Sequence, residues 1–324
     1  MKLKLEDVCE RGSSSLKQSD ILGMTGDYPI YGASGYIGNV DFYHQEKPYV
    51  AIVKDGAGIG RTTFHTAKSS VIGTMQYLLP KDNVLPKYLY YVVGHMHLEK
   101  YFSGATIPHI YFKDYKSEEF NYDSLDKQKN IVEILGRCEK VISARKRELE
   151  LLDSLIKARF VEMFGDVKYG SERWGGKPFK DITINLDSKR KPVKDADRKR
   201  MQGIYPYYGA TGIVDYINDY RQDGDFLLIS EDGKALELRS KPIAFLASGK
   251  IWVNNHAHVQ QCTDECNMIY LMYHINFMDI SIWVTGIDQK KLNRANLDTI
   301  PIALPPIELQ EQFAAFVHQV DKSK

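Results

Sequence analysis

The sequence has no apolar run approaching 18 residues free of charge, so it predicts no membrane-spanning helix. Its first residues, MKLKLEDVCE, lack the apolar centre of a secretory signal. Four cysteines in 324 residues are too few for a disulfide framework, which is typical of a reducing compartment. Together these absences predict a cytoplasmic protein.

An excess of either charge is also missing. The chain has 43 Lys and Arg against 42 Asp and Glu, a net charge of +1, so any binding of a polyanion must depend on local basic patches. The composition, 43% hydrophobic and 26% charged, is that of a protein with a packed core. The length suffices for two domains of roughly 100–200 residues each.

Known catalytic motifs are absent as well. We find no P-loop, GxSxG or HExxH, and no strand–GxGxxG–helix unit for S-adenosylmethionine. The only Pro-Pro pair, Pro305-Pro306, stands in LPPI and not in the Asx-Pro-Pro-aromatic motif of adenine methyltransferases. The sequence therefore predicts no catalytic residues and no cofactor, which favours a binding protein over an enzyme.

One cluster could suggest zinc, because His256, His258, Cys262 and Cys266 follow each other as H-x-H-x₃-C-x₃-C. Structural zinc sites usually combine two close pairs that are separated by a longer segment. Here all four residues are crowded together, so we predict no metal site.

The most informative feature is an internal repeat. Residues 28–43 read YPIYGASGYIGNVDFY and residues 205–220 read YPYYGATGIVDYINDY, with the shared residues offset by 177. Segments 102–110 and 124–132 align more loosely with 284–292 and 306–314 at an offset of 182. A period this long is not that of a solenoid repeat and indicates two copies of one domain.

Between these motifs each copy predicts mixed secondary structure. Short β-branched and aromatic runs predict strands at 49–54, 70–79, 225–230, 242–247 and 250–253. Amphipathic patterns predict helices at 86–102 and 268–284. The fold class is therefore α/β, in the mixed α+β sense.

A long helix follows the first copy. The stretch from Ser124 to Phe164 has no proline, and its apolar residues recur at alternating steps of three and four. This seam consists of Ile131, Leu135, Cys138, Ile142, Leu149, Leu152, Ile156 and Met163. At 1.5 Å per residue the helix would be about 60 Å long and would pack against another long helix. The alternative is a helix that lies on its own domain.

The second copy begins an equivalent helix after Pro305-Pro306 but reaches Lys324 about 22 residues short of its twin, by comparison with the first copy. We expect either a truncated form or a coil that another polypeptide completes. The predicted organisation is one copy of the domain at 1–123, a long helix at 124–165, the second copy of the domain at 166–304 and an incomplete second helix at 305–324.

Glycine-rich segments in each copy are candidate binding loops. KDGAGIGR (54–61) follows a strand but precedes a β-branched stretch, which argues against a dinucleotide site and for a strand–loop–strand. Such a loop could bring backbone N–H groups to phosphate, or it could be a plain turn. The candidate DNA-binding residues of the first copy are Lys54, Arg61, Thr62, Thr63, His65 and Lys68.

The second copy offers polar groups around SEDGKAL (230–236) and ASGKIWVNNHAHV (247–259), including asparagine, which can pair with adenine. The candidates are Lys234, Ser248, Lys250, Asn254, Asn255, His256 and His258. The alternative is that NNHAHV forms a buried polar network that orients a loop. The basic run 188–202 could contact the DNA backbone or could be a solvated loop.

The duplicated motifs resemble those of a known family. Both copies contain YPxYGAxG, and each ends in a helix introduced by (I/L)xxQ, at Leu125–Gln128 and Ile307–Gln310. With NNHAHV at 254–259, the chain resembles the specificity subunit of type I restriction–modification enzymes over nearly its whole length.

The resemblance implies a non-catalytic function. Each target recognition domain would read one half of a split site in double-stranded DNA, and the two helices would form an antiparallel coiled coil that fixes the spacing. Methyltransferase subunits would dock on the helices, and motor-nuclease subunits would join for cleavage. The short second helix departs from the family pattern. The alternatives are a self-contained DNA methyltransferase or nuclease, and a coiled-coil scaffold without DNA affinity.

Overall fold

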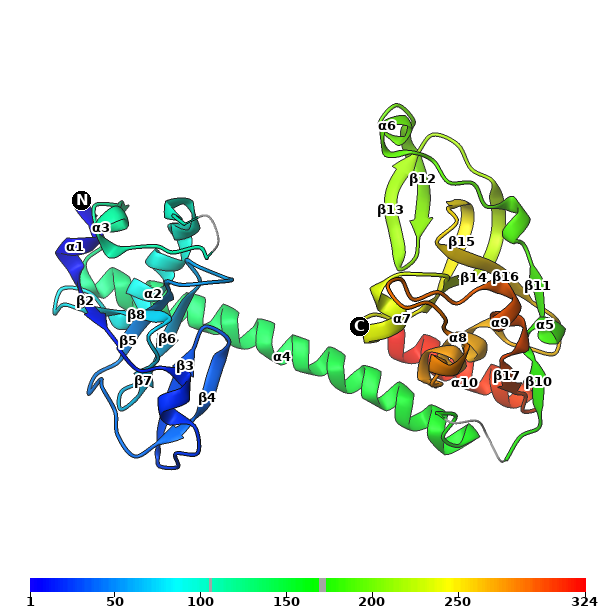
Figure 1. The fold of residues 1–324 in the computed structure, drawn as a ribbon, viewed down its shortest axis with the longest axis horizontal. Helices are drawn as coiled ribbons and strands as arrows, with labels where there is room; N and C mark the ends of the chain where they lie inside the picture. The colour runs from blue at the N-terminus through cyan, green and yellow to red at the C-terminus, as the bar shows by residue number, and fades with distance from the viewer. Residues whose placement is uncertain (105–106, 169–172) are drawn as a thin grey trace. The chain divides into compact units, whose positions relative to one another are not determined.

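The computed structural model describes residues 1–104, 107–168 and 173–324, and the chain forms two compact units (Figure 1). Unit 1 comprises Met1–Ala144 and unit 2 comprises Arg145–Lys324. Residues 105–106 of the repeated segment 102–110, and residues 169–172 of the predicted second domain, lie outside the described residues. The boundary between the units falls inside α4 (Leu125–Phe164), so this helix contributes turns to both.

Unit 1 is built on two small sheets. The larger is antiparallel and has the order β2-β8-β5-β6; the smaller has the order β4-β3-β7, with β3 parallel to β7. A third pair joins the two ends of the unit, β1 to β9. The strands are β1 (Lys2–Lys4), β2 (Cys9–Ser13), β3 (Tyr28–Gly32), β4 (Gly35–Val40), β5 (Tyr49–Val53), β6 (Thr62–His65), β7 (Ser70–Val71), β8 (Met75–Pro80) and β9 (Glu119–Asn121). The helices are α1 (Leu5–Val8), η1 (Gln18–Ile21), α2 (Pro86–His95), η2 (Leu98–Tyr101) and α3 (Phe112–Tyr115).

Strand β5 is the centre of unit 1, because all five of its residues are buried. Val50 and Ile52 pack into the cluster that contains the buried residues of α2. Tyr49, Ala51 and Val53 pack into a second cluster on the other face. A strand covered on both faces reads as an unbroken apolar run, as the YVAIV segment does.

Unit 2 contains a six-stranded sheet of order β11-β16-β14-β15-β12-β13, in which only β12 and β15 pair in parallel. A separate pair joins β10 to β17. The strands are β10 (Gly176–Pro178), β11 (Thr183–Asn185), β12 (Gln202–Gly209), β13 (Gly212–Ile217), β14 (Gln222–Ser230), β15 (Ala244–Val253), β16 (Ala257–Cys262) and β17 (Pro301–Ala303). The helices are α5 (Phe179–Ile182), η3 (Asp187–Lys189), α6 (Asp195–Arg198), α7 (Lys234–Leu238), α8 (Met268–Phe277), η4 (Ser281–Trp283), α9 (Arg294–Thr299) and α10 (Ile307–Asp321).

The two units repeat the same plan, and the mixed fold predicted from the sequence is confirmed. The β3–β4 hairpin of unit 1 corresponds to β12–β13, and β5 corresponds to β14. Like β5, the second half of β14 is buried, with Leu227 and Ile229 on one face and Phe226 and Leu228 on the other. The offset of 177 therefore relates whole elements and not merely a shared motif.

Some predicted elements have different bounds. The two strands expected at 242–247 and 250–253 form one strand, β15, which continues through Gly249 at a φ of +78°. The helices expected at 86–102 and 268–284 end at His95 and Phe277, and a short 3₁₀ turn follows each. The apolar pattern continued through these turns because Leu98 in the first is buried and Trp283 in the second packs against the core, whereas Ile282 is exposed.

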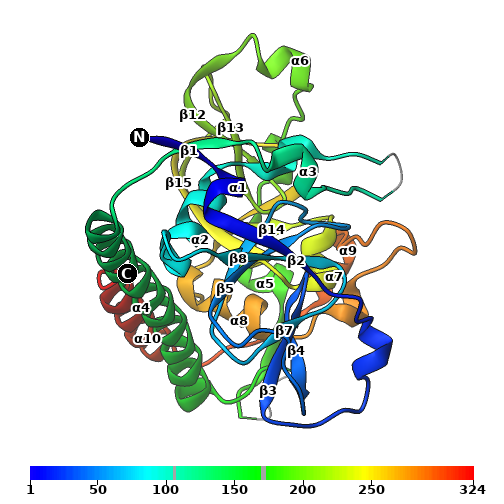
Figure 2. The same cartoon turned by 90° about the vertical axis from the view of Figure 1, so that its left-hand side faces the viewer.

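Within unit 2, α10 runs antiparallel to the second half of α4 and lies beside it in both views (Figures 1 and 2). Phe313, near the start of α10, stacks edge-on against Phe160 and Phe164, near the end of α4. At the opposite end, Arg145 donates hydrogen bonds of 3.0 and 2.7 Å to the carbonyls of Ser323 and Lys324. Ile156, a residue of the predicted seam, is buried in the same core cluster as these three phenylalanines.

The seam is only partly covered. Ile156 is buried, whereas the seam residues Leu135, Cys138 and Ile142 are exposed. Ile131 lies in between, packed at the edge of the unit 1 core. Thus α4 is anchored at both ends, and the apolar side chains of its middle turns stay open to solvent.

A buried glutamine attaches α4 to unit 1. The Gln128 side chain has no exposed surface, and its Oε1 accepts a 2.8 Å hydrogen bond from the backbone N–H of Leu85. Its Nε2 donates to the carbonyls of Asn83 and Asp123 at 3.2 and 2.9 Å. One amide group thereby ties the start of the helix to the loop before α2 and to the segment that leads into the helix.

Gln310 repeats this network in unit 2. It too is fully buried, and its Oε1 accepts from the N–H of Asn267 at 2.8 Å. Its Nε2 donates to the carbonyls of Glu265 and Pro305. All three partners lie 182 residues after their counterparts in unit 1, so the (I/L)xxQ motif has a structural meaning as an anchor of the helix.

The candidate residue His65 belongs to the core of unit 1. It is 7% exposed and its ring lies against those of Tyr31 and Tyr49. Its Nε2 lies 2.8 Å from the hydroxyl of Thr63. Burial lowers the pKa of His65 to about 4, because the charged ring would lose its hydration there.

We predict that Gln128→Ala and Gln310→Ala each destabilise their unit by roughly 2–4 kcal/mol, because each removes three hydrogen bonds and leaves buried backbone groups unpaired. Chemical unfolding of the full chain measures the effect. Gln18→Ala, at an exposed position, is the control and should change little. A loss below about 1 kcal/mol in either buried variant would contradict the anchoring role.

We further predict that His65 makes unit 1 less stable as the pH falls from about 6.5 to about 4. In this range the unfolded chain takes up a proton that folded His65 resists, which costs up to about 3 kcal/mol below the folded pKa. His65→Phe should flatten this dependence, measured by hydrogen exchange of the β5 and β6 amides at several pH values. His97→Phe, at an exposed histidine, should not. Equal pH profiles for His65→Phe and the unaltered chain would show that His65 does not carry the effect.

Candidate nucleic-acid interface

The glycine-rich segment of unit 1 forms the loop between β5 and β6, as the predicted strand–loop–strand requires. Gly56, Gly58 and Gly60 have φ values of +84°, +86° and +80°, a region that other residues rarely adopt. The loop is closed by hydrogen bonds between the backbones of Val53 and Arg61 and between Gly60 and Val53. No helix follows, so this loop lacks the geometry of a dinucleotide site.

An aspartate and a histidine meet at the start of this loop. The Nδ1 of His109 lies 2.6 Å from Oδ1 of Asp55, and Nζ of Lys54 lies 2.5 Å from its other oxygen. Burial would raise the pKa of Asp55, but the hydrogen bonds from Lys54 and His109 outweigh it and hold that pKa below its usual value. Asp55 is therefore ionised near neutral pH and fixes both neighbouring side chains.

The outer side of the loop borders a hollow of about 630 Å³. Arg61, Tyr90, Tyr91 and His95 are among the residues that line it. The Arg61 side chain is exposed and could donate hydrogen bonds toward a ligand from this edge.

The equivalent loop of unit 2 follows β14 and reads Glu231-Asp232-Gly233. It leads directly into the short helix α7 and is therefore shorter than its counterpart. Glu231 and Asp232 occupy the positions of Lys54 and Asp55 at the same offset of 177. The first residue of the loop is therefore positively charged in unit 1 and negatively charged in unit 2.

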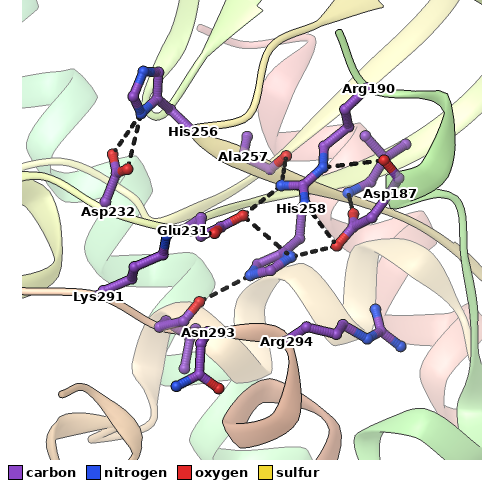
Figure 3. Close-up of polar contacts among 12 residues, drawn as sticks. Asp187, Arg190, Glu231, Asp232, His256, Ala257, His258, Lys291, Asn293 and Arg294 are labelled. Carbon is purple, nitrogen blue, oxygen red and sulfur yellow. Dashed lines mark hydrogen bonds and ion pairs between the residues drawn. The ribbon is translucent and has the colours of Figure 1, made fainter. Parts of the chain in front are cut away.

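Glu231 belongs to a buried network of charges, shown in Figure 3. Its carboxylate accepts from Arg190 at 2.5 Å and pairs with Lys291 at 3.0 Å. Burial would raise the pKa of Glu231, yet the hydrogen bonds from Arg190 and Lys291 lower it overall. The network therefore ties β14, the segment before α6 and the segment before α9 to one another.

His258 lies at the centre of this network and is fully buried. Its Nδ1 is 2.6 Å from Oδ2 of Asp187, and its Nε2 is 2.8 Å from the carbonyl oxygen of Leu292. Both partners accept hydrogen bonds, an arrangement that a ring with a hydrogen on each nitrogen satisfies. Burial would raise the pKa of Asp187, but hydrogen bonds from His258 and from the N–H of Val259 lower it.

His256 differs from His258, although only one residue separates them. Its side chain is 47% exposed, and its Nδ1 lies 2.8 Å from Oδ2 of Asp232. In Figure 3 its ring stands apart from the buried network, at the edge of the site. His256 is therefore available to a ligand, whereas His258 is part of the protein interior.

The structure sorts the candidate residues by exposure. Those exposed are Arg61, Lys68, Lys234, Ser248, Lys250, Asn255 and His256. Those half-buried are Lys54, Thr62 and Thr63. Lys250 lies on β15 with its Nζ 4.7 Å from the centre of the Tyr220 ring, so it joins an aromatic surface.

His65, Asn254 and His258 must be taken out of the candidate set. All three are buried: His65 in an aromatic core, His258 in the charge network, and Asn254 as the acceptor of a 2.8 Å hydrogen bond from the N–H of His256. The alternative reading of NNHAHV, a buried polar network that orients a loop, describes Asn254 and His258. Side chains whose polar atoms are satisfied internally have no surface to offer a ligand.

Sequence reasoning missed the acidic residues of the site and their partners. Asp55, Asp232 and Asp187 were not selected, nor were His109 and Arg190. A signal was available for the first two, because the 177-residue offset that relates the Tyr/Gly motifs also aligns Asp55-Gly56 with Asp232-Gly233. The other three come from segments distant in sequence, and nothing in their local pattern shows which carboxylate they meet.

The described residues contain neither a metal-binding cluster nor a membrane-spanning helix. Within them, no group of three or more His, Cys, Asp or Glu side chains is placed to hold a metal ion. Nor does any helix in the described part of the chain have the length and apolar character needed to cross a bilayer.

Each unit thus presents a loop at which exposed cations and an imidazole stand beside a carboxylate, which is half-buried at Asp55 and buried at Asp232. Cations and imidazoles of this kind can donate to phosphate oxygens and can contact the polar edges of bases. The exposed groups arise from strand ends and loops that a rigid sheet supports, which is the usual location of binding residues.

The comparison with known proteins agrees with this geometry. The type I restriction modification DNA specificity domain family matches residues 1–152 and 172–324. A protein of Haemophilus influenzae named as a type I restriction enzyme specificity subunit is 38% identical over 144 residues, 44% of this chain and 36% of that protein. The EcoprrI specificity subunit of Escherichia coli is 25% identical over 125 residues, 39% of this chain and 30% of that protein.

The matched segment thus spans about a third of the length of these curated relatives. Among solved structures, the type I restriction-modification system S subunit from M. genitalium has a TM-score of 0.68 at 16% identity and covers 100% of this chain and 89% of its own. That likeness concerns the fold. With the family matched in both copies of the repeat, the chain belongs to the family of type I restriction modification DNA specificity domains.

Proposed function

We propose that the chain is the DNA-recognition subunit of a type I restriction–modification enzyme and has no catalytic centre of its own. Each unit reads one half of a bipartite site in double-stranded DNA. The observation that carries this proposal is the duplication itself: two units with corresponding strands, a corresponding loop and a glutamine-anchored helix suit two separated stretches of duplex. The relatives' names, as specificity subunits, support the same function.

In this proposal the domains at 1–123 and 166–304 are target recognition domains, and α4 sets the distance between the half-sites. The helices also dock methyltransferase subunits, and motor-nuclease subunits join for cleavage. The exposed apolar residues in the middle of α4 support the docking role, because apolar side chains left in water favour a partner. Such a complex acts on DNA in the cytoplasm.

The proposed contacts lie on the glycine-loop side of each unit, facing the major groove. In unit 1 they are Lys54, Arg61, Thr62, Thr63 and Lys68; in unit 2 they are Lys234, Ser248, Lys250, Asn255 and His256. Arginine and lysine are suited to guanine and phosphate, and asparagine to adenine. The exposed residues of this set are the better placed to reach bases.

The basic run 188–202 adds contacts to the DNA backbone. Arg190 and Arg198 are engaged by Asp187, Glu231, Asp195 and Asp215 inside the protein. Lys189, Lys191 and Lys194 are exposed. We assign phosphate contacts to these three lysines, which would position the DNA without reading its sequence.

Two other functions would be supported by different results. A self-contained methyltransferase or nuclease would turn over DNA when the purified chain is given magnesium and S-adenosylmethionine without partners. A scaffold would show no DNA affinity in a mobility-shift assay at low salt. The proposed recognition subunit binds duplex DNA in that assay and does not modify it.

We predict that replacing Lys189, Lys191 and Lys194 with alanine weakens binding to specific and non-specific DNA alike. If all three contact phosphates, the slope of log K against log salt should fall in magnitude by up to about three. The control removes Lys177, Lys180 and Lys322, which belong to β10, α5 and the end of α10, away from α6 in unit 2 (Figure 1). A salt slope unchanged in the first variant would rule out these contacts.

We also predict that the length of α4 determines the spacer between half-sites. Seven residues inserted between Ala144 and Arg145 lengthen the helix by about 10 Å, the rise of about three base pairs. Mapping of methylated adenines in cells that supply the methyltransferase subunits would report the new spacer. The same insertion in the exposed loop at Ser240 is the control. A spacer that stays constant after the helix insertion would refute the ruler function.

A further inference from the structure

Each unit carries a histidine paired with the aspartate at the start of its loop. In unit 1, Nδ1 of His109 lies 2.6 Å from Asp55; in unit 2, Nδ1 of His256 lies 2.8 Å from Asp232 (Figure 3). The two aspartates are equivalent positions of the repeat, 177 residues apart. The same carboxylate therefore fixes an imidazole in both copies.

The two histidines are not equivalent positions. His109 forms a backbone bridge with Asp55, and the residue that forms this bridge with Asp232 is Lys291. The counterpart of His256 in unit 1 is Thr74: each accepts a hydrogen bond at its carbonyl oxygen from the residue before the loop aspartate. In both units a histidine is paired with the loop aspartate, but that histidine comes from a different segment in each unit. What the two units share is therefore the Asp–His pair itself, and not an equivalent position for the histidine in the fold.

Both imidazoles have a free edge. The side chains of His109 and His256 are 35% and 47% exposed, while the aspartates beneath them are 25% and 12% exposed. Among the described residues, no protein group hydrogen-bonds to Nε2 of either ring. His258 shows the contrast, because both of its nitrogens are engaged and its side chain is buried.

The hydrogen bond between aspartate and histidine determines which group of the DNA the free Nε2 of the histidine can recognise. A neutral imidazole that donates its Nδ1 hydrogen to a carboxylate presents an unprotonated Nε2, which accepts a hydrogen bond in a fixed direction. In the major groove the hydrogen-bond donors are the exocyclic amino groups of adenine and cytosine. A rotationally fixed acceptor is thus complementary to an amino-bearing base edge.

We propose that His109 and His256 are specificity-determining residues, each accepting a hydrogen bond at Nε2 from the exocyclic amino group of an adenine or cytosine in the half-site of its own unit. This inference rests on the proposed function. Asp55 and Asp232 are positioning residues in it, since they set the ring orientation and leave contact with the base to the histidines.

The experiment begins with the full chain and a randomised duplex library, from which bound sequences are selected and sequenced. His109→Ala should relax discrimination about tenfold or more at one base pair of one half-site and leave the other half unchanged. His256→Ala should do the same in the opposite half. His97→Ala and His318→Ala remove exposed histidines that lack a paired aspartate, and should leave both halves unchanged.

His109→Lys and His256→Thr are second variants, because each introduces the residue that the twin unit carries at that place and so should fold. They should also lose the preference at the same base pair. A loss spread over both half-sites, or unaltered preferences in all four variants of His109 and His256, would overturn the proposal.

The decisive step removes the amino group from the DNA. At the base pair where the alanine variant loses discrimination, adenine is replaced by purine, or cytosine by pyrimidin-2-one. The analogue that weakens binding then identifies the base that is read. The unaltered chain should lose about tenfold in affinity with one of these analogues, and the matching alanine variant should lose nothing further. Equal losses in both proteins would show that another group reads that base. A chain that binds no duplex at all would instead refute the proposed function.

Discussion

The structure depends on a requirement that the buried backbone groups around the start of α4 and the start of α10 find hydrogen-bond partners. Gln128 meets it in unit 1 and Gln310 in unit 2, each by placing a buried carboxamide among three main-chain groups. A side chain that both donates and accepts suits this place, and a carboxylate or an amine would leave part of it unpaired. This contact therefore ties the start of α4 to unit 1 and the start of α10 to unit 2.

The sequence allowed much of this to be predicted. The repeated Tyr/Gly motif, the strand pattern at 49–54 and the proline-free stretch after Ser124 each indicate their element through sequence pattern alone, and the structure contains all three. The strands at 242–253 were divided wrongly at Ser248 and Gly249, because a Ser-Gly dipeptide resembles a turn. In the fold Gly249 faces Gly224 across the ladder, and β15 continues through it.

The site was less predictable, and the reason is physical. A histidine in a polar string has the same local appearance whether it faces solvent or a buried carboxylate. His256 and His258 stand two positions apart on one polypeptide and have opposite environments, which depend on Asp232 and Asp187 from other segments. The two units also differ here: the offset of 182 places Gln76 where unit 2 has His258, and Gln76 faces Ser13 across the ladder. A neutral pair in one copy has thus become a charged network in the other, and only the three-dimensional pairing shows it.

The shared helix has one further consequence. Its ends are held by two separate cores, but the run Val141–Glu148 is exposed throughout and gains little from either one. Helical turns with few tertiary contacts open more readily than those in a packed core. The central turns of α4 should therefore exchange their amide protons sooner than the two ends of the same helix, which pack against the cores of the two units.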